Sequence, residues 1–181
     1  MSGMGFGDFA SACIERSRVS RHNCKLSGMF TVELWRGKEI VAVRKAQNAI
    51  VNVGLDHALG VIFRSDSQIN PWNIGLINHS PVPTFSPLDT MASNNFTEFI
   101  GYDEATREDW NEDAASGQSI TNSTAASFTI NAGATLNGIF LVQSNVKNEV
   151  ASTLWSTASF TSTLPVESLD VVKITYTVNA V

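Results

Sequence analysis

The C-terminal third of the chain, Gln118 to Val181, is the feature that most limits the possible folds. It contains four short runs in which β-branched and aromatic residues recur at about every second position, as strands with one buried face and one solvated face require. Turn-forming segments separate the runs. This spacing predicts an antiparallel meander whose strands are Ser127 to Ile130, Leu136 to Val142, Thr153 to Phe160 and Val171 to Val178.

The same stretch is poor in charge. Its only charged residues are Lys147, Glu149, Glu167, Asp170 and Lys173, so its solubility depends on hydroxyl and amide groups. Such a composition is typical of a sheet that packs against neighbouring molecules. In this sheet Leu154, Trp155, Phe160 and Tyr176 compete for one buried face, which leaves apolar surface for a symmetric partner.

Two further elements are predicted upstream. Met29 to Gln47 alternates apolar and polar residues around an interruption at Arg36 to Glu39, which predicts a β-hairpin. The next segment, Asn48 to Phe63, has helical spacing and predicts one helix packed on a sheet through Ile50, Val51, Leu55, Ala58, Leu59 and Ile62. Gly54 and Gly60 weaken this helix by up to about 1 kcal/mol each, so it needs tertiary support or breaks near Gly60.

The middle of the chain combines short strands with a long loop. Trp72 to Ile77 is predicted to be a strand, and Ala92 to Tyr102 could hold another short one. Between them, Pro81, Pro83 and Pro87 prevent regular pairing, which predicts a long ordered loop.

These signals predict a mainly β protein, with an antiparallel β-sandwich or jelly-roll-like domain over residues 28–181, one short helix, and an extended N-terminal arm over residues 1–27. A chain of 181 residues can bury roughly 70% of its unfolded surface without disulfides. Both cysteines, Cys13 and Cys24, lie outside the predicted core, which favours synthesis in a reducing compartment. No apolar run is long enough for a membrane span or a signal peptide, so neither membrane insertion nor classical secretion is expected.

The charge is divided unevenly along the chain. Residues up to Arg64 carry nine Lys and Arg against five Asp and Glu, whereas the remainder carries three against twelve. The basic residues of the arm would reach acidic groups on a partner while two phenylalanines anchor it, which makes Phe6, Phe9, Arg16, Arg18, Arg21 and Lys25 the candidate partner-binding residues. A frayed terminus is the alternative interpretation. Because no aromatic residues are interleaved with this thin basic cluster, nucleic acid is not expected as a ligand.

An acidic stretch is the best candidate for a cation site. Arg107 alone balances seven carboxylates, those of Glu98, Asp103, Glu104, Glu108, Asp109, Glu112 and Asp113. Their spacing matches no calcium-binding loop, so a solvated or inter-subunit acidic face is the preferred interpretation. The set of Cys13, His22 and Cys24 fits no usual zinc spacing, and no nucleotide-binding or nucleophile motif occurs. We therefore expect no metal, no cofactor and no enzymatic activity.

Several short motifs resemble those of a group of tailed-bacteriophage virion proteins, described as capsid decoration (cement) proteins or as structural proteins. The resemblance spans about Phe30 to Val178 and lies in Asn48 to Gly54, Trp72 to Ile77, Phe85 to Thr90, Tyr102 with Arg107 and Trp110, Ile120 to Asn122, Phe128, Gly138 to Leu141 and Val171 to Thr177. It implies a β-rich fold, homo-oligomers, for which a trimer is the first expectation, and no enzymatic activity. The expected partner is the major capsid protein, and the expected location is the capsid surface of a virion assembled in the host bacterial cytoplasm.

Two other function classes remain open at the level of sequence. A tail or fibre component that contributes to host adsorption would expose aromatic residues such as Trp35, Trp110 or Trp155 in a groove. A carbohydrate-active enzyme of the tail would need two carboxyl groups about 5 to 10 Å apart. Glu108 and Glu112 could supply this pair, but we expect no neighbour that desolvates either acid and raises its pKa.

Overall fold

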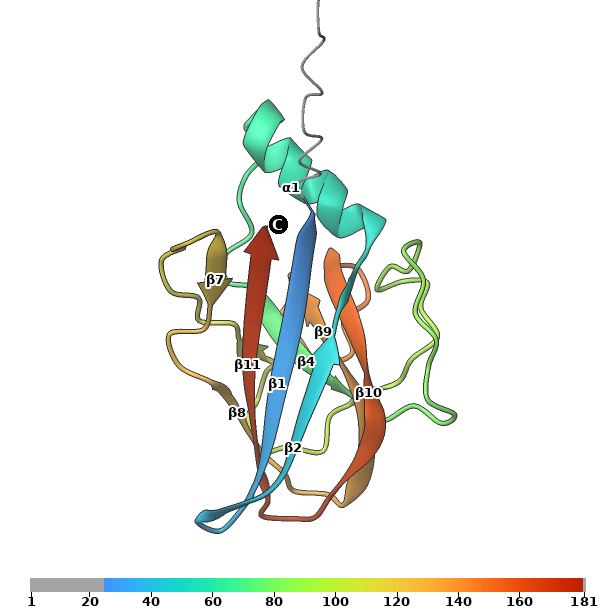
Figure 1. The fold of residues 1–181 in the computed structure, drawn as a ribbon. Coiled ribbons are helices and arrows are strands. Elements are labelled where there is room, and N and C mark those ends of the chain that lie inside the picture. The colour runs from blue at the N-terminus through green and yellow to red at the C-terminus, as the bar shows by residue number, and fades with distance from the viewer. Residues whose placement is uncertain (1–24, 181) are drawn as a thin grey trace, which may run out of the picture.

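The computed structural model describes residues 25–180, which form two antiparallel β-sheets packed on each other and one helix (Figure 1). Sheet A contains β1 (Leu26–Arg36), β2 (Glu39–Gln47), β7 (Ser119–Thr121), β8 (Ala126–Thr129) and β11 (Val171–Ala180). Sheet B contains β3 (Ala49–Ile50), β4 (Asn73–Ile77), β5 (Glu98–Phe99), β6 (Glu108–Asp109), β9 (Ala134–Val142) and β10 (Leu154–Val166). The helix α1 spans Asn52–Arg64. The prediction of a mainly β, sandwich-type domain with one helix is confirmed.

The predicted hairpin is present as β1 and β2. Its inner face is formed by Phe30, Val32 and Leu34, which are buried and alternate with partly exposed residues. The chain reverses at Gly37, whose φ of +63° lies in the left-handed region that glycine adopts without steric cost. The strand β1 already begins at Leu26, so Leu26 and Ser27 belong to the sheet and not to the arm.

The four predicted C-terminal strands exist as β8 to β11, but the predicted meander is wrong. The strands β9 and β10 pair in sheet B, whereas β8 and β11 pair in sheet A. The chain therefore crosses between the sheets twice, after β8 and after β10. The long partner of β11 is β1, along a register that runs from Leu26 opposite Ala180 to Trp35 opposite Val171. Through this pairing, the N-terminal hairpin and the C-terminal strand β11 belong to one sheet.

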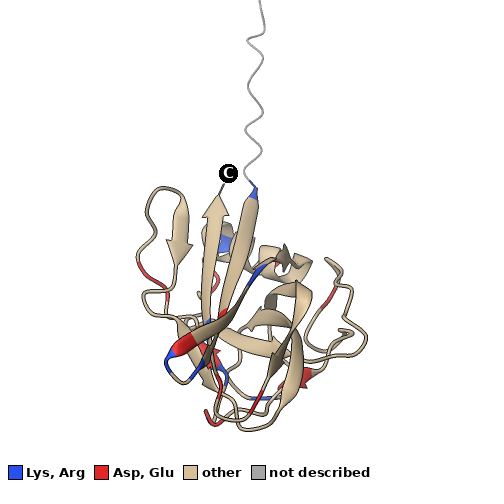
Figure 2. Cartoon of the chain, turned by 60° about the horizontal axis from the view of Figure 1, so that its bottom comes forward, with Lys and Arg blue, Asp and Glu red and all other residues tan. Residues whose placement is uncertain are grey.

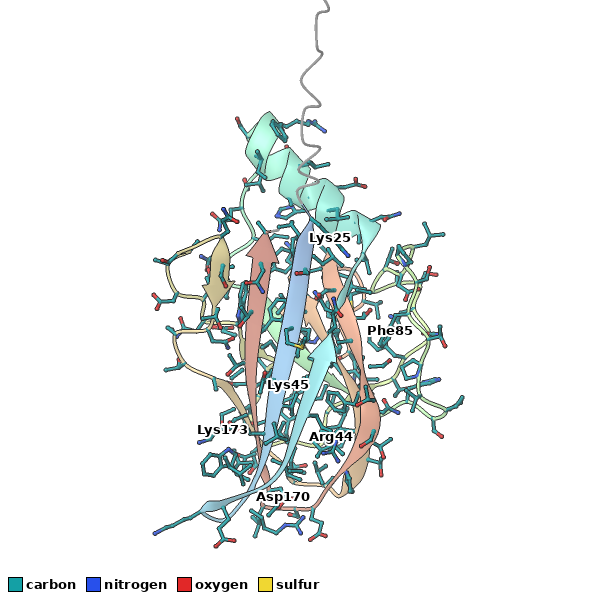
Figure 3. The ribbon with its side chains drawn as sticks, in the orientation of Figure 1. Lys25, Arg44, Lys45, Phe85, Asp170 and Lys173 are labelled. Carbon is teal, nitrogen blue, oxygen red and sulfur yellow. The ribbon has the colours of Figure 1, made fainter. Side chains whose placement is uncertain are left out.

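Sheet B is buried on both faces. Its inner face shares the main core with sheet A, where the rings of Phe30 and Tyr176 stack with centroids 4.1 Å apart. Its outer face is covered by the loop of residues 78–97, which contributes Phe85, Met91 and Phe96 to a second cluster (Figures 1 and 3). The prediction of a long ordered loop after Ile77 is thus confirmed. Burial on both faces also explains why the residues of β4 are nearly all apolar and do not alternate.

The helix differs from its prediction in both extent and orientation. It begins at Asn52, because Ala49 and Ile50 pair with β10 as the short strand β3, and it continues past Gly60 to Arg64. Gly54 and Gly60 are its buried residues, while Leu55, Leu59 and Ile62 are exposed. A Cβ atom at Gly54 would lie 2.8 Å from the carbonyl oxygen of Trp155, so the missing side chain lets the helix backbone approach β10. Leu55, Leu59 and Ile62, which were expected to face the sheet, therefore point away from it, whereas Val51, just before the helix, is buried as expected.

Candidate functional site

Most of the predicted partner-binding residues of the arm, Phe6, Phe9, Arg16, Arg18 and Arg21, lie outside the residues that the structure describes. Cys13, His22 and Cys24 lie outside them as well. Lys25 is the one arm candidate that is described. It is exposed and directly precedes β1, at the end of the molecule that carries α1 (Figure 3).

The acidic stretch does not form a cluster. Its carboxylates accept hydrogen bonds from separate parts of the chain: Glu98 from Arg107, Asp103 from Asn131, Glu104 from the backbone of Thr129, Glu112 from Asn70 and Asp113 from the backbone of Ala114. Among residues 25–180, no three His, Cys, Asp or Glu side chains gather in a way that could hold a metal ion. Glu98, Asp103, Glu104 and Glu112 instead connect segments that are distant in the sequence, whereas Asp113 bonds only to the next residue.

The most deeply buried of these contacts is the ion pair of Arg107 and Glu98. Both nitrogens of one guanidinium edge, Nε and Nη2, donate to the two oxygens of Glu98 at 2.8 Å, and the side chains are 0% and 5% exposed. Nη1 donates to the carbonyl oxygen of Ser144, and Nη2 also donates to that of Glu149. The pair therefore ties the acidic segment to the β9–β10 connection. The sequence signal was a single arginine among seven acids, but burial of the pair is visible only in the structure.

The environment of Glu108 differs from the one expected from the sequence. Burial raises the pKa of the Glu108 carboxyl, and the nearby charges of Glu104 and Asp109 raise this pKa further. The expectation that neither acid of the Glu108 and Glu112 pair is desolvated is therefore wrong for Glu108. Glu112 lies at an isolated bridge to Asn122, and its carboxylate accepts a hydrogen bond from Asn70.

The three tryptophans considered for a receptor-binding groove are all engaged within the domain. Trp110 is buried, and its indole nitrogen donates to the carbonyl oxygen of Tyr176 at 3.0 Å. The indole nitrogen of Trp155 donates to the hydroxyl of Tyr176 at 3.1 Å. The face of Trp35 is covered by the ammonium of Lys173, which lies 4.4 Å from the ring centroid. These contacts give each indole a structural role.

Tyr176 is fully buried and brings a hydrogen-bonded hydroxyl group into the core. Its hydroxyl accepts hydrogen bonds from Asn48 at 2.6 Å and from Trp155, and its ring packs between Phe30 and Trp110. Burial raises the pKa of Tyr176 to about 12. The second tyrosine of the chain, Tyr102, is buried too, and burial together with the charge of Glu98 raises its pKa well above the usual value.

We expect both tyrosines to resist ionisation in the folded protein. The neutral phenols stabilise the native state below the unfolded pKa of about 10, and this contribution is lost as the pH rises through the folded values. The free energy of unfolding should therefore decline above about pH 10. Phenolate absorbance measured during an alkaline titration tests this, with circular dichroism as the monitor of folding. A tyrosine that titrates near its unperturbed pKa while the domain is still folded would contradict the expectation.

A polar cleft of about 620 Å³ lies between residues 67–73 and the β9–β10 connection. Its lining is mainly amide and hydroxyl side chains with one carboxylate and three apolar residues, and it includes Gln68, Ile69, Asn70, Pro71, Asn73, Gln143, Asn145, Glu149, Ala151 and Ser152. Asn73 is buried and donates to the carbonyl oxygen of Gln143 at 2.7 Å. The lining holds neither histidine nor cysteine.

The outer face of sheet A is the broadest candidate for an interaction surface. We define it by the exposed or partly exposed residues of three paired strands: Met29, Thr31, Glu33 and Trp35 on β1, Ile40, Val43 and Lys45 on β2, and Val171, Lys173, Thr175 and Thr177 on β11. Glu33 lies opposite Lys173 in the register, so the negative charge of Glu33 has a positive charge beside it on the same face. Figure 2 shows that the acidic and basic residues gather mainly toward the β1–β2 turn and the loops.

The edge of this sheet adds apolar surface. Ile40, Val41 and Val43 on β2 are all close to half exposed. Within the described residues, β2 is the outermost strand of sheet A, with β1 as its only hydrogen-bonded strand neighbour. β10 lies beside part of this strand, because Arg44 donates to the carbonyl oxygens of Ser162 and Thr163. The half-exposed aliphatic side chains of β2 remain a surface to which another polypeptide can bind.

Comparisons with known proteins leave the family open. The chain matches no protein-family model, and a search of curated proteins finds no significant relative. Within residues 25–180, no helix has the length and apolar character needed to cross a bilayer.

Proposed function

We propose that this protein is a structural protein of a bacteriophage virion, namely a capsid decoration protein that binds and stabilises the head lattice. The proposal rests on the resemblance of its short motifs to such proteins. The observation that best supports it is the outer face of sheet A, which combines threonines, half-exposed aliphatic residues and few charges over three long strands. A surface of this kind suits lateral contact with other subunits better than binding of a small ligand.

We include self-association in the proposal, with a homotrimer as the first expectation from the resemblance. The edge strand β2 and the outer face of sheet A would supply the contact surface. Light scattering of the purified protein at micromolar concentration should give the mass of a trimer. A strict monomer would mean that the protein depends on the virion surface for its assembly.

The proposed partner is the major capsid protein, which the arm would contact through Phe6, Phe9 and the basic residues Arg16, Arg18, Arg21 and Lys25. No catalytic residue, metal or cofactor has a part in this role. The engaged tryptophans Trp110 and Trp155 favour it over the alternative of a tail or fibre component with an aromatic groove.

Deletion of the protein from the phage tests this function. Because a bound decoration protein stabilises only the assembled head, full heads without it should rupture at a lower temperature, while host adsorption should be unchanged. Heads of unchanged thermal stability together with lost adsorption would contradict the proposal and favour a tail component.

A further inference from the structure

The helix α1 carries an apolar face that no described part of the chain covers. Leu55, Leu59, Ile62 and Phe63 follow one another at helical spacing, and Ile62 and Phe63 are 69% and 77% exposed. The opposite side of the helix holds the buried glycines, of which Gly54 lies against Trp155 of β10 and Gly60 beside the Asp66 side chain. A helix that buries its glycines and exposes its largest apolar side chains needs a partner on the exposed side.

The size of this face favours a short peptide over a folded partner. A stable interface between two folded proteins involves about 20 to 30 residues on each side, whereas four large side chains form the α1 face. A segment of the same chain needs far less contact area, because its tether keeps it at an effective concentration of about a millimolar.

The N-terminal sequence contains a segment that matches the face. Apolar residues at helical spacing, i, i+3, i+4, i+7 and i+8, are Phe6, Phe9, Ala10, Cys13 and Ile14. Gly7, Asp8, Ser11 and Ala12 fall between them and Glu15 follows, so residues 6–14 would present one side that carries the large apolar residues.

The chain enters the domain at the end of the molecule that carries α1, where Lys25 lies (Figure 3). Gly28 exchanges backbone and side-chain hydrogen bonds with Asn48, just before β3 and α1. The eleven residue steps between Ile14 and Lys25 can span at most about 40 Å. The 13 residues of α1 extend over only about 20 Å. The segment can therefore reach any part of the exposed face.

We propose that residues 6–14 of the same chain bind the exposed face of α1, with Phe6, Phe9 and Ile14 against Leu59, Ile62 and Phe63. This intramolecular contact does not depend on the proposed function. If the protein is a decoration protein, Phe6 and Phe9 exchange the α1 face for the capsid when the arm binds its partner, and the α1 face then becomes available.

The cysteines allow a direct test, because both lie in the N-terminal segment and Cys13 belongs to its apolar side. In a Cys24→Ser background, Cys13 is the only thiol. We expect N-ethylmaleimide to modify it at least about tenfold more slowly in the native protein than in denaturant at the same pH, since only the undocked fraction reacts. The substitutions Ile62→Ser and Phe63→Ser together should raise the native rate toward the denatured one.

The matched control is Leu169→Ser, which removes an apolar side chain that is 79% exposed, next to Asp170 at the end of the molecule opposite α1 (Figure 3), and should leave the rate unchanged. The proposal is overturned if native Cys13 reacts at the denatured rate, or if the α1 substitutions leave its protection intact. Protection that increases with protein concentration would also overturn it, because a second copy would then be the occupant.

Discussion

Replacing Arg107 by alanine should destabilise the protein by about 3 to 5 kcal/mol, because the fully buried arginine is lost and the buried carboxylate of Glu98 keeps only the backbone N–H of Asn148 as a donor. It also removes donors from two carbonyl groups of the β9–β10 connection, those of Ser144 and Glu149. The free energy of unfolding of a typical domain is only about 5 to 15 kcal/mol, so this loss would be a large part of it. Urea unfolding followed by circular dichroism measures it.

Two comparison variants separate burial from charge. Arg36 forms an equally close bidentate pair with Asp170. The Asp170 side chain is only 2% exposed beneath the arginine, but Arg36 itself is 48% exposed, so its removal opens Asp170 to water, and Asp170 keeps its hydrogen bond from the backbone of Glu167. Arg36→Ala should therefore cost only about 1 kcal/mol. The double variant Arg107→Met with Glu98→Leu should be less destabilised than Arg107→Ala alone, since it leaves no unpaired charge. Equal losses in the Arg107 and Arg36 variants would show that burial of the ion pair does not matter.

The strands could be predicted from sequence because their signal is local. Alternating burial in β1 and β11 follows from residues two positions apart, such as Val172, Ile174 and Tyr176. The assignment of strands to sheets could not be predicted in the same way. The pairing of β11 with β1 joins residues more than 130 positions apart, and no local pattern in either strand specifies it.

The orientation of α1 shows a second limit. Its apolar spacing correctly indicated a helix, but the same spacing was taken to mark the buried side. Gly54 was the better indicator, because a helix approaches a strand most closely where it has no side chain, and Gly54 lies against Trp155 of β10. The buried pair of Glu98 and Arg107 shows a third limit. A lone arginine among acids is equally compatible with a solvated face, and only the packing around it shows that the pair is buried.

The number of copies in the virion tests the proposed decoration function most directly, because the two candidate functions predict very different copy numbers. A decoration protein repeats wherever the head lattice repeats, whereas a tail component is limited to the few copies that one vertex can hold. The N-terminal arm supports the first arrangement, because Phe6, Phe9 and its basic residues suit contact along another protein, and the sequence contains none of the repeats that a fibre shaft requires.

Quantitative mass spectrometry of purified particles gives the ratio of this protein to the major capsid protein without any change to the phage. Peptides from the described domain, such as those around Arg107 and Lys147, would be counted against peptides of the major capsid protein. We predict a copy number comparable with that of the major capsid protein. A few copies per particle would contradict the decoration function and would leave the β-sandwich fold unaffected.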